Sequence, residues 1–171
     1  LELTQTIRTQ DREGSLLGVI DQTKTPMGAR LLREWVVSPL RVSTDIKYRQ
    51  IGVKELFENS ALRREFRDIL GNIYDMERIS TKVSCARANA RDLISLKQSL
   101  SKLPALKDKL TFCITDIFVC LEQQLDVLEE VRILIGTALV PDPPPAIKDG
   151  GLIREGYDAS LDELRYISKN G

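Results

Sequence analysis

The sequence predicts a mainly α-helical protein, a bundle of about six to seven helices with one small β element. Apolar residues recur three or four positions apart over most of the chain, as on one face of a helix. Short polar breaks separate these stretches, and the expected core is rich in Leu and Ile because aromatic residues make up only 5% of the chain. With 171 residues, the chain is long enough to form one domain with its own core.

The first expected elements are a strand over residues 1–7 and a helix over residues 25–36. Residues 1–7 alternate between apolar and polar side chains, which is typical of a strand. Thr25 can cap the helix, and Pro26 suits its first position, where the missing N–H costs nothing. The predicted buried stripe of this helix recurs every four residues at Met27, Leu31 and Trp35, with Leu32 and Val36 beside it.

Four further helices are expected between residues 43 and 104. Their starts are predicted at Ser43, Ser60, Asp75 and Asn89, and Asp92 follows Asn89 by three residues in a capping arrangement. Their apolar stripes are Ile46, Val53, Leu56 and Phe57; then Leu62, Phe66, Ile69 and Leu70; then Met76, Ile79, Val83 and Ala86; and then Leu93, Leu96, Leu100 and Leu103.

The C-terminal half carries the longest helix candidate, over residues 114–139, after Pro104 has stopped the preceding helix. The proline-rich residues 141–145 are expected to run extended. Residues 149–157 place turn glycines around a short β-prone piece, which predicts a small strand pairing with residues 1–7.

These elements predict a single domain over residues 1–171. It comprises the strand 1–7, a helical core over 15–140, an extended linker with a short strand over 141–157, and the start of another helix over 158–171. The expected first strand begins at Leu1 without an initiator Met, and the expected last helix begins close to the end of the chain. We therefore expect a fragment of a longer protein. No repeat of 20 to 50 residues is present, which weighs against a solenoid.

Charge and hydropathy limit the possible partners. The 25 basic and 25 acidic residues cancel, so the chain lacks the bulk positive field typical of nucleic-acid-binding proteins. No signal peptide is found, and charged residues interrupt every window of about 20 residues, which predicts a cytoplasmic protein without a membrane span.

Motifs for catalysis and for nucleotide binding are missing from the sequence. The chain has no histidine, which excludes Ser-His-Asp and Cys-His catalysis, and it has no G-x-x-x-x-G-K-[ST] phosphate loop. Ser99 and Lys102 match the S-x-x-K motif of serine acyltransferases of the penicillin-binding class. The partner motifs of that class, S-D-N and K-T-G, are absent from the sequence. Glu129 and Glu130 are adjacent on a helix and diverge by about 100°, so they favour a solvated face over an acid and base pair. We expect no catalytic or cofactor-binding residue.

Three cysteines, Cys85, Cys113 and Cys120, form no C-x-x-C pair, so neither a disulfide framework nor a metal site is expected. If their segment is helical, Cys113 and Cys120 lie on the same face of the helix. They are then about 10 Å apart along the helix axis, which is too far for both to bind one zinc ion. Cys113 and Cys120 are predicted to be small buried apolar residues.

Two basic clusters leave two interpretations open, a phosphate-contacting patch or ordinary ion pairs at the surface. The clusters are Arg63, Arg64 and Arg67, and farther along Arg87, Arg91 and Lys97. Glu65, Asp68 and Asp92 interleave them, which favours the ion pairs. The sequence therefore identifies no DNA-contacting residue.

Four blocks in order resemble the core (lever) domain of the MutS family of DNA mismatch-recognition ATPases. The first is Leu1-Glu2-Leu3-Thr4, and the second spans residues 14–40 with the helix start described above. The third comprises residues 75–79 and 87–93, where bacterial members often have Pro in place of Ala90. The fourth comprises residues 144–145, 149–158 and 161–164.

The resemblance implies a helical lever that couples the mismatch-binding and clamp regions of a parent protein to its ATPase. That parent is implied to bind ATP and Mg²⁺, to encircle mismatched double-stranded DNA as a homodimer, and to work with repair partners such as MutL. The family's Phe-x-Glu mispair domain, ATPase motifs and clamp are not in this sequence. The chain alone is therefore expected to be neither an enzyme nor a cofactor-binding protein.

Two other functions stay open. The second MutS class shares the core and the ATPase but lacks the mispair domain and acts on other DNA structures. A helical protein-interaction scaffold is the alternative outside the family. The sequence that flanks this chain in its parent would discriminate between them.

Overall fold

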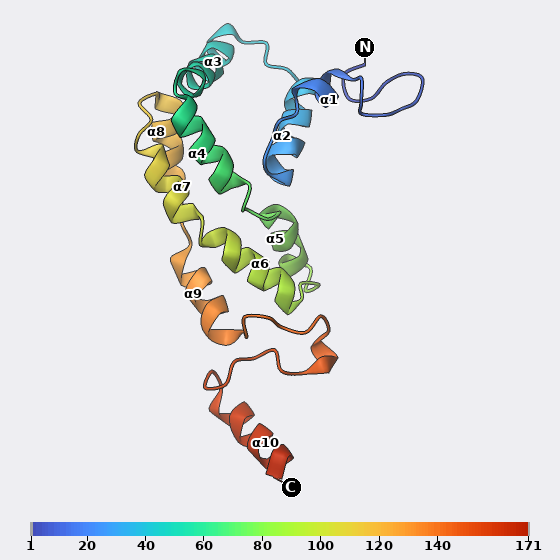
Figure 1. Cartoon of the computed structure of the whole chain (residues 1–171), viewed down its shortest axis with the longest axis vertical. Coiled ribbons are helices and arrows are strands. Elements are labelled where there is room, and N and C mark those ends of the chain that lie inside the picture. The colour runs from blue at the N-terminus through green and yellow to red at the C-terminus, as the bar shows by residue number, and fades with distance from the viewer. Residues whose placement is uncertain (1, 171) are drawn as a thin grey trace. The chain divides into compact units, whose positions relative to one another are not determined.

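The computed structural model describes residues 2–170, and these residues are mainly helical, as predicted (Figure 1). They divide into two compact units. Unit 1 comprises the described residues up to 75 together with 102–127, and unit 2 comprises 76–101 together with the described residues from 128 onward. None of the described helices is long and apolar enough to cross a membrane.

Unit 1 contains α1 (Leu16–Ile20), α2 (Pro26–Val37), α3 (Ser43–Glu58), α4 (Ser60–Leu70), α7 (Leu103–Leu110) and α8 (Asp116–Gln124). Helix α3 packs on α4 and α8, and α7 packs on the same two helices. The core of this group consists of Leu62, Phe66, Leu110 and Cys113, covered by Leu56, Leu106, Phe118 and Leu125. The rings of Phe66 and Phe118 stack with their centroids 6.4 Å apart. We call α3, α4, α7 and α8 the body of unit 1.

Unit 2 contains α5 (Met76–Ser84), α6 (Ala90–Leu100), α9 (Glu129–Ala138), the 3-10 turn η1 (Ile147–Asp149) and α10 (Ala159–Asn170). Helix α6 packs on both α5 and α9. Its core consists of Ala90, Ile94, Ile135 and Leu139, covered by Leu93, Leu96, Ala138, Leu152 and Ile153. The predicted capping arrangement is confirmed, because the Asn89 side chain accepts from the Asp92 amide and the Asp92 carboxylate accepts from the Asn89 amide.

The strand expected over residues 1–7 is wrong for residues 2–7, and Leu1 lies outside the described residues. The carbonyls of Glu2 and Leu3 instead accept from the amides of Leu16 and Leu17, at 3.0 and 2.9 Å. They thereby satisfy N–H groups at the start of α1 that have no partner within the helix.

The small strand expected over residues 149–157 is likewise reduced to one antiparallel bridge, between Leu139 and Ile153, in the described part of the chain. Val140 donates to the Leu152 carbonyl at 3.0 Å, and Arg154 donates to the Ala138 carbonyl at 2.8 Å. The β-prone piece therefore pairs with the chain that leaves α9, and not with residues 1–7.

The chain forms more helices than the six to seven expected, because several predicted helices are shorter. The candidate over residues 114–139 is two helices, since α8 ends at Gln124 and Leu128 adopts a left-handed conformation (φ 50°) before α9. Helix α5 ends at Ser84, where Ala86 is left-handed (φ 52°) and the Arg87 amide closes a Schellman turn on the Lys82 carbonyl. Pro104 ends no core helix but lies in the first turn of α7.

Helix α8 starts where it does because Glu55 of α3 binds the chain just before it. The Glu55 carboxylate accepts from the amides of Ile114 at 2.6 Å and Thr115 at 3.1 Å, and from the Thr115 hydroxyl. Desolvation raises the pKa of Glu55, but these hydrogen bonds together outweigh it, and the pKa lies below its usual value of 4.5. A carboxylate far away in sequence thus acts as the cap of α8.

We predict opposite effects for the same substitution at two helical glycines. A Cβ on Gly52 would lie 2.7 Å from Cγ2 of the β-branched Ile117, so Gly52→Ala should lower the free energy of unfolding by about 1 to 2 kcal/mol. A Cβ on Gly136 would meet only the flexible end of Lys97, so Gly136→Ala should raise it by about 0.5 to 1 kcal/mol through helix propensity. Urea denaturation followed by circular dichroism measures both, and equal effects would contradict the close approach of α3 and α8.

Glu55→Gln should lower the free energy of unfolding at neutral pH by about 1 to 2 kcal/mol, because hydrogen bonds to a charged acceptor are lost. Since the folded-state pKa is lowered, the native chain should lose this stabilisation as the pH falls below about 4.5 and passes through that pKa. The two chains should therefore converge in stability at low pH. Glu58→Gln on the same helix is the control, because Glu58 is exposed and lies 3.8 Å from Lys54. A constant difference between the two chains from neutral to acid pH would refute the cap.

Candidate functional site

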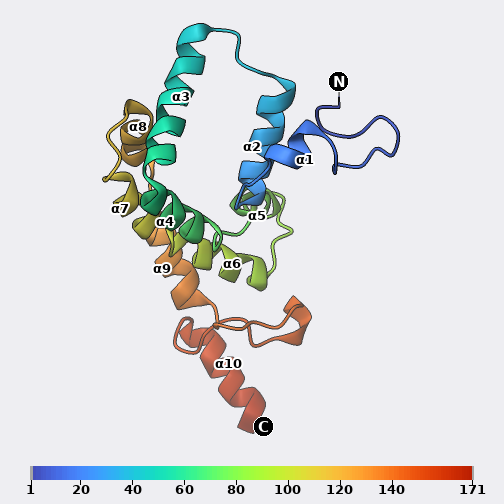
Figure 2. The same ribbon diagram turned by 45° about the horizontal axis from the view of Figure 1, so that its top comes forward.

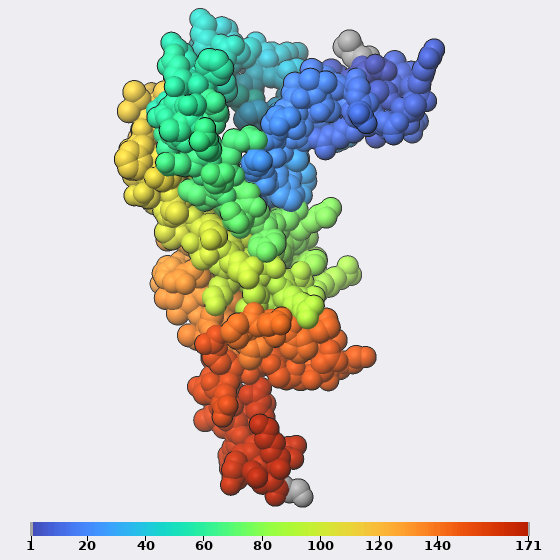
Figure 3. Space-filling model, in the orientation of Figure 1, coloured from blue at the N-terminus to red at the C-terminus, as the bar shows by residue number. Residues whose placement is uncertain are grey.

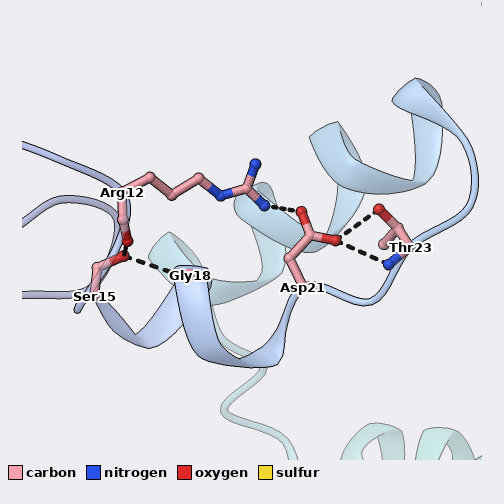
Figure 4. A network of polar contacts seen from close by, with 5 residues as sticks. All are labelled: Arg12, Ser15, Gly18, Asp21 and Thr23. Atoms are coloured by element: carbon pink, nitrogen blue, oxygen red, sulfur yellow. Dashed lines mark hydrogen bonds and ion pairs between the residues drawn. The ribbon is translucent and has the colours of Figure 1, made fainter.

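The most extensive polar network of unit 1 lies around α1 (Figure 4). Ser15 caps α1, since its hydroxyl donates to the Arg12 carbonyl at 2.6 Å and accepts from the Gly18 amide at 3.1 Å. At the far end of the helix, Asp21 accepts from the amide of Thr23 at 2.9 Å and from its hydroxyl at 2.6 Å. The Arg12 guanidinium reaches along α1 and pairs with the Asp21 carboxylate.

The network fixes the loop before α1 against the helix itself. Ser15 is completely buried, and a Cβ on Gly18 would collide with the Arg12 carbonyl oxygen. Only glycine permits this close approach. Hydrogen bonds from Thr23 and the charge of Arg12 hold the pKa of Asp21 below its usual value. The Asp21 carboxylate therefore stays ionised and keeps both of its partners at neutral pH.

The contacts that attach this N-terminal region to the rest of unit 1 include three made by arginine side chains. Arg30 of α2 forms a two-bonded ion pair with Asp75, at 2.7 and 2.8 Å. Arg67 of α4 donates to the Gln22 carbonyl at 3.0 Å. The Arg49 guanidinium of α3 lies 3.7 Å from the centre of the Trp35 ring, in cation–π geometry. We call α1, α2 and their flanking residues 2–40 the arm, and these three contacts the arm junction.

The predicted buried stripe of α2 is correct only in part, because Met27, Leu32 and Val36 are partly buried. No α2 side chain is fully buried, and Leu31 and Trp35 are 46% and 40% exposed. The periodicity found the helix and the Thr25 cap, whose hydroxyl accepts from the Gly28 amide at 3.0 Å. It could not show that charged and cation–π contacts also attach the helix within unit 1.

The chemistry of the arm junction suits positioning and not a reaction. Its polar groups bind one another or backbone carbonyls, and none of them forms a nucleophile and base pair. Among residues 2–170, no buried side-chain nitrogen or oxygen lacks a hydrogen-bond partner, and no group of three or more Cys, Asp or Glu residues is arranged to hold a metal ion.

Ser99, Glu129 and Glu130, the catalytic candidates of the sequence analysis, have environments typical of structural residues. Ser99 is completely buried in α6, and its hydroxyl donates to the Ser95 carbonyl at 2.9 Å. Glu129 pairs with Arg132 one turn along α9, and this partner lowers the pKa of Glu129. Glu130 is exposed.

The prediction that Cys113 and Cys120 are buried is correct for Cys113 and wrong for Cys120. Burial, followed by the nearby charge of Glu55, raises the pKa of the Cys113 thiol to about 11. Cys85 and Cys120 are exposed. Cys113 lies in the turn before α8, so it does not share a helix with Cys120.

The basic clusters form contacts other than the expected ion pairs. Arg63 donates to the Leu56 and Phe57 carbonyls at 2.6 and 2.9 Å, which closes the end of α3, and Arg91 donates to the Pro143 carbonyl at 2.9 Å. The interleaved carboxylates pair elsewhere: Glu65 with Lys109 at 2.8 Å and Asp92 with Lys82 at 2.7 Å. Arginines are thus used as helix caps and cross-links, a role that sequence spacing could not reveal.

Comparison with known proteins agrees with this helical arrangement. A family model described as MutS domain III matches residues 1–169. The chain is 46% identical over all 171 residues to DNA mismatch repair protein MutS of Acetivibrio thermocellus, of which it covers 20%. It is 42% and 44% identical over the same length to the MutS proteins of Clostridium novyi and Alkaliphilus metalliredigens, of which it covers 19%.

The chain therefore spans about a fifth of the length of the curated relatives that it matches. The match is continuous, and it includes both compact units. This chain belongs to the MutS family, in which it corresponds to domain III.

Proposed function

We propose that the chain is the structural lever of a DNA mismatch repair protein, which couples mismatch binding and the clamp to a distant ATPase. The observation that carries the proposal is the continuous match to MutS domain III over residues 1–169. The relatives named DNA mismatch repair protein MutS, at 41–46% identity, support mismatch repair as the process.

Packing in each unit suits a mechanical role. Coupling between distant sites is carried by elements that rearrange as units and do not deform continuously. Unit 1 supplies a core shared by the body helices, and unit 2 supplies one shared by α6, α9 and the chain after α9. Tertiary caps such as Glu55 on α8 and Arg63 on α3 lock helix ends to neighbouring helices.

We propose that the parent supplies the DNA-binding and ATPase activities that the lever couples. It would bind ATP with Mg²⁺, hold mismatched double-stranded DNA as a homodimer, recruit MutL and act in the cytoplasm. Within it, residues 1–171 would form one domain. The helical core over 15–140 would be followed by the extended 141–157 region and by the helix that leads toward the clamp from residue 158.

The isolated chain should neither hydrolyse ATP nor prefer mismatched over matched duplex. Equilibrium titration with both duplexes at moderate salt, together with a phosphate-release assay, measures the two properties. The parent protein is the positive control in each assay. A clear mismatch preference of the isolated chain would overturn the assignment of roles.

In the parent, Glu55→Ala should weaken coupling while leaving mismatch binding without nucleotide unchanged, because it loosens the packing of α8 against α3. We expect the stimulation of ATP turnover by mismatched DNA to fall by about fivefold or more. Glu58→Ala, one turn along the same helix and exposed, is the matched control. Normal stimulation in a folded Glu55→Ala parent would contradict a lever role, and stimulation by other DNA structures alone would favour the second MutS class.

A further inference from the structure

The arm is attached to the body of unit 1 without sharing its core. All members of that core cluster come from residues 56–125, in the body helices and the turn between α7 and α8, and the arm contributes none. In Figures 1 and 2 the α2 ribbon runs apart from those of α3 and α4, and in Figure 3 the blue atoms of the arm form a lobe beside the green atoms of the body. The arm junction is among the contacts that hold the arm to the rest of unit 1.

The residues of the arm also form hydrogen bonds and an ion pair with one another. Leu17 and Ser15 are buried, and the amides of Leu16 and Leu17 bind the carbonyls of Glu2 and Leu3. Arg12 spans α1 to Asp21, and Thr25 caps α2. These bonds lie entirely within the arm, so they persist whether or not the arm junction is intact.

The arm junction is partly open to water. The side chains of Arg30 and Asp75 keep 42% and 17% of their accessible area. An ion pair at a partly exposed site is screened by salt, whereas a shared apolar core is not. Regions with few buried apolar contacts open locally at a lower free energy than the core does. The boundary between arm and body is therefore the easiest place for unit 1 to open.

We propose that the arm is a latch, an element that releases from the rest of unit 1 as one piece when the Arg30–Asp75 pair opens, while the body stays folded. The inference goes beyond the lever function and does not depend on it. It gives unit 1 two discrete states, arm docked and arm released. The half-exposed Leu31 and Trp35 on α2 become fully accessible in the released state.

Hydrogen exchange measured by mass spectrometry on the 171-residue chain tests the latch. Arg30→Gln should raise the exchange rate of α2 amides by about three- to tenfold, because the released 12-residue helix has lost its tertiary support and opens more often, and leave α4 and α7 amides unchanged. Salt at about 1 M should reproduce this pattern in the unsubstituted chain. Arg33→Gln, on the same helix with the same change of charge, is the control and should leave α2 exchange unchanged.

Two results would overturn the proposal. Equal increases in α2, α4 and α7 would show that arm and body open together. Unchanged α2 exchange in Arg30→Gln and at high salt would show that the junction does not hold the arm. Trp35→Leu provides a second variant, because it removes the cation–π contact with Arg49 and keeps an apolar side chain. It should also raise α2 exchange alone.

Discussion

Short helices leave many backbone groups without a partner, and the closing of these ends is the constraint on which this structure depends. An α-helix has four N–H and four C=O groups at its ends that find no bond within the helix. In unit 1, distant side chains close them: Glu55 binds the start of α8, Lys107 donates to the Leu125 carbonyl at its end, and Arg63 closes α3. Each bond joins two helices, so satisfying the backbone also fixes the packing.

The body of unit 1 and the arm differ in the contacts that close and join their helices. Body helices are joined by caps and by a shared apolar core around Phe66. The arm is closed by local bonds such as that of Ser15 to Gly18, and it reaches the body through charged and cation–π contacts. A rigid group of helices carrying a weakly attached element suits a protein that transmits a change of state between distant sites.

Sequence patterns found the features that are local and missed those that are tertiary. The Asn89–Asp92 capping box and the Thr25 cap were predictable because donor and acceptor lie three residues apart. The Arg30–Asp75 pair spans 45 residues and the Glu55 cap spans 59, so no spacing rule could reveal them. The break between α8 and α9 was missed for a related reason. Apolar periodicity continues through a segment whose geometry is set by Lys107 and by the left-handed Leu128.

Native-state hydrogen exchange over a series of sub-denaturing urea concentrations tests the central claim most directly. If tertiary caps and a shared core make the body one cooperative element, then amides of α3, α4, α7 and α8 should converge on a single opening free energy with a single urea dependence. If instead α8 opens well below α3 and α4, with a smaller urea dependence of its own, then the caps do not bind the helices into one rigid body and the account fails.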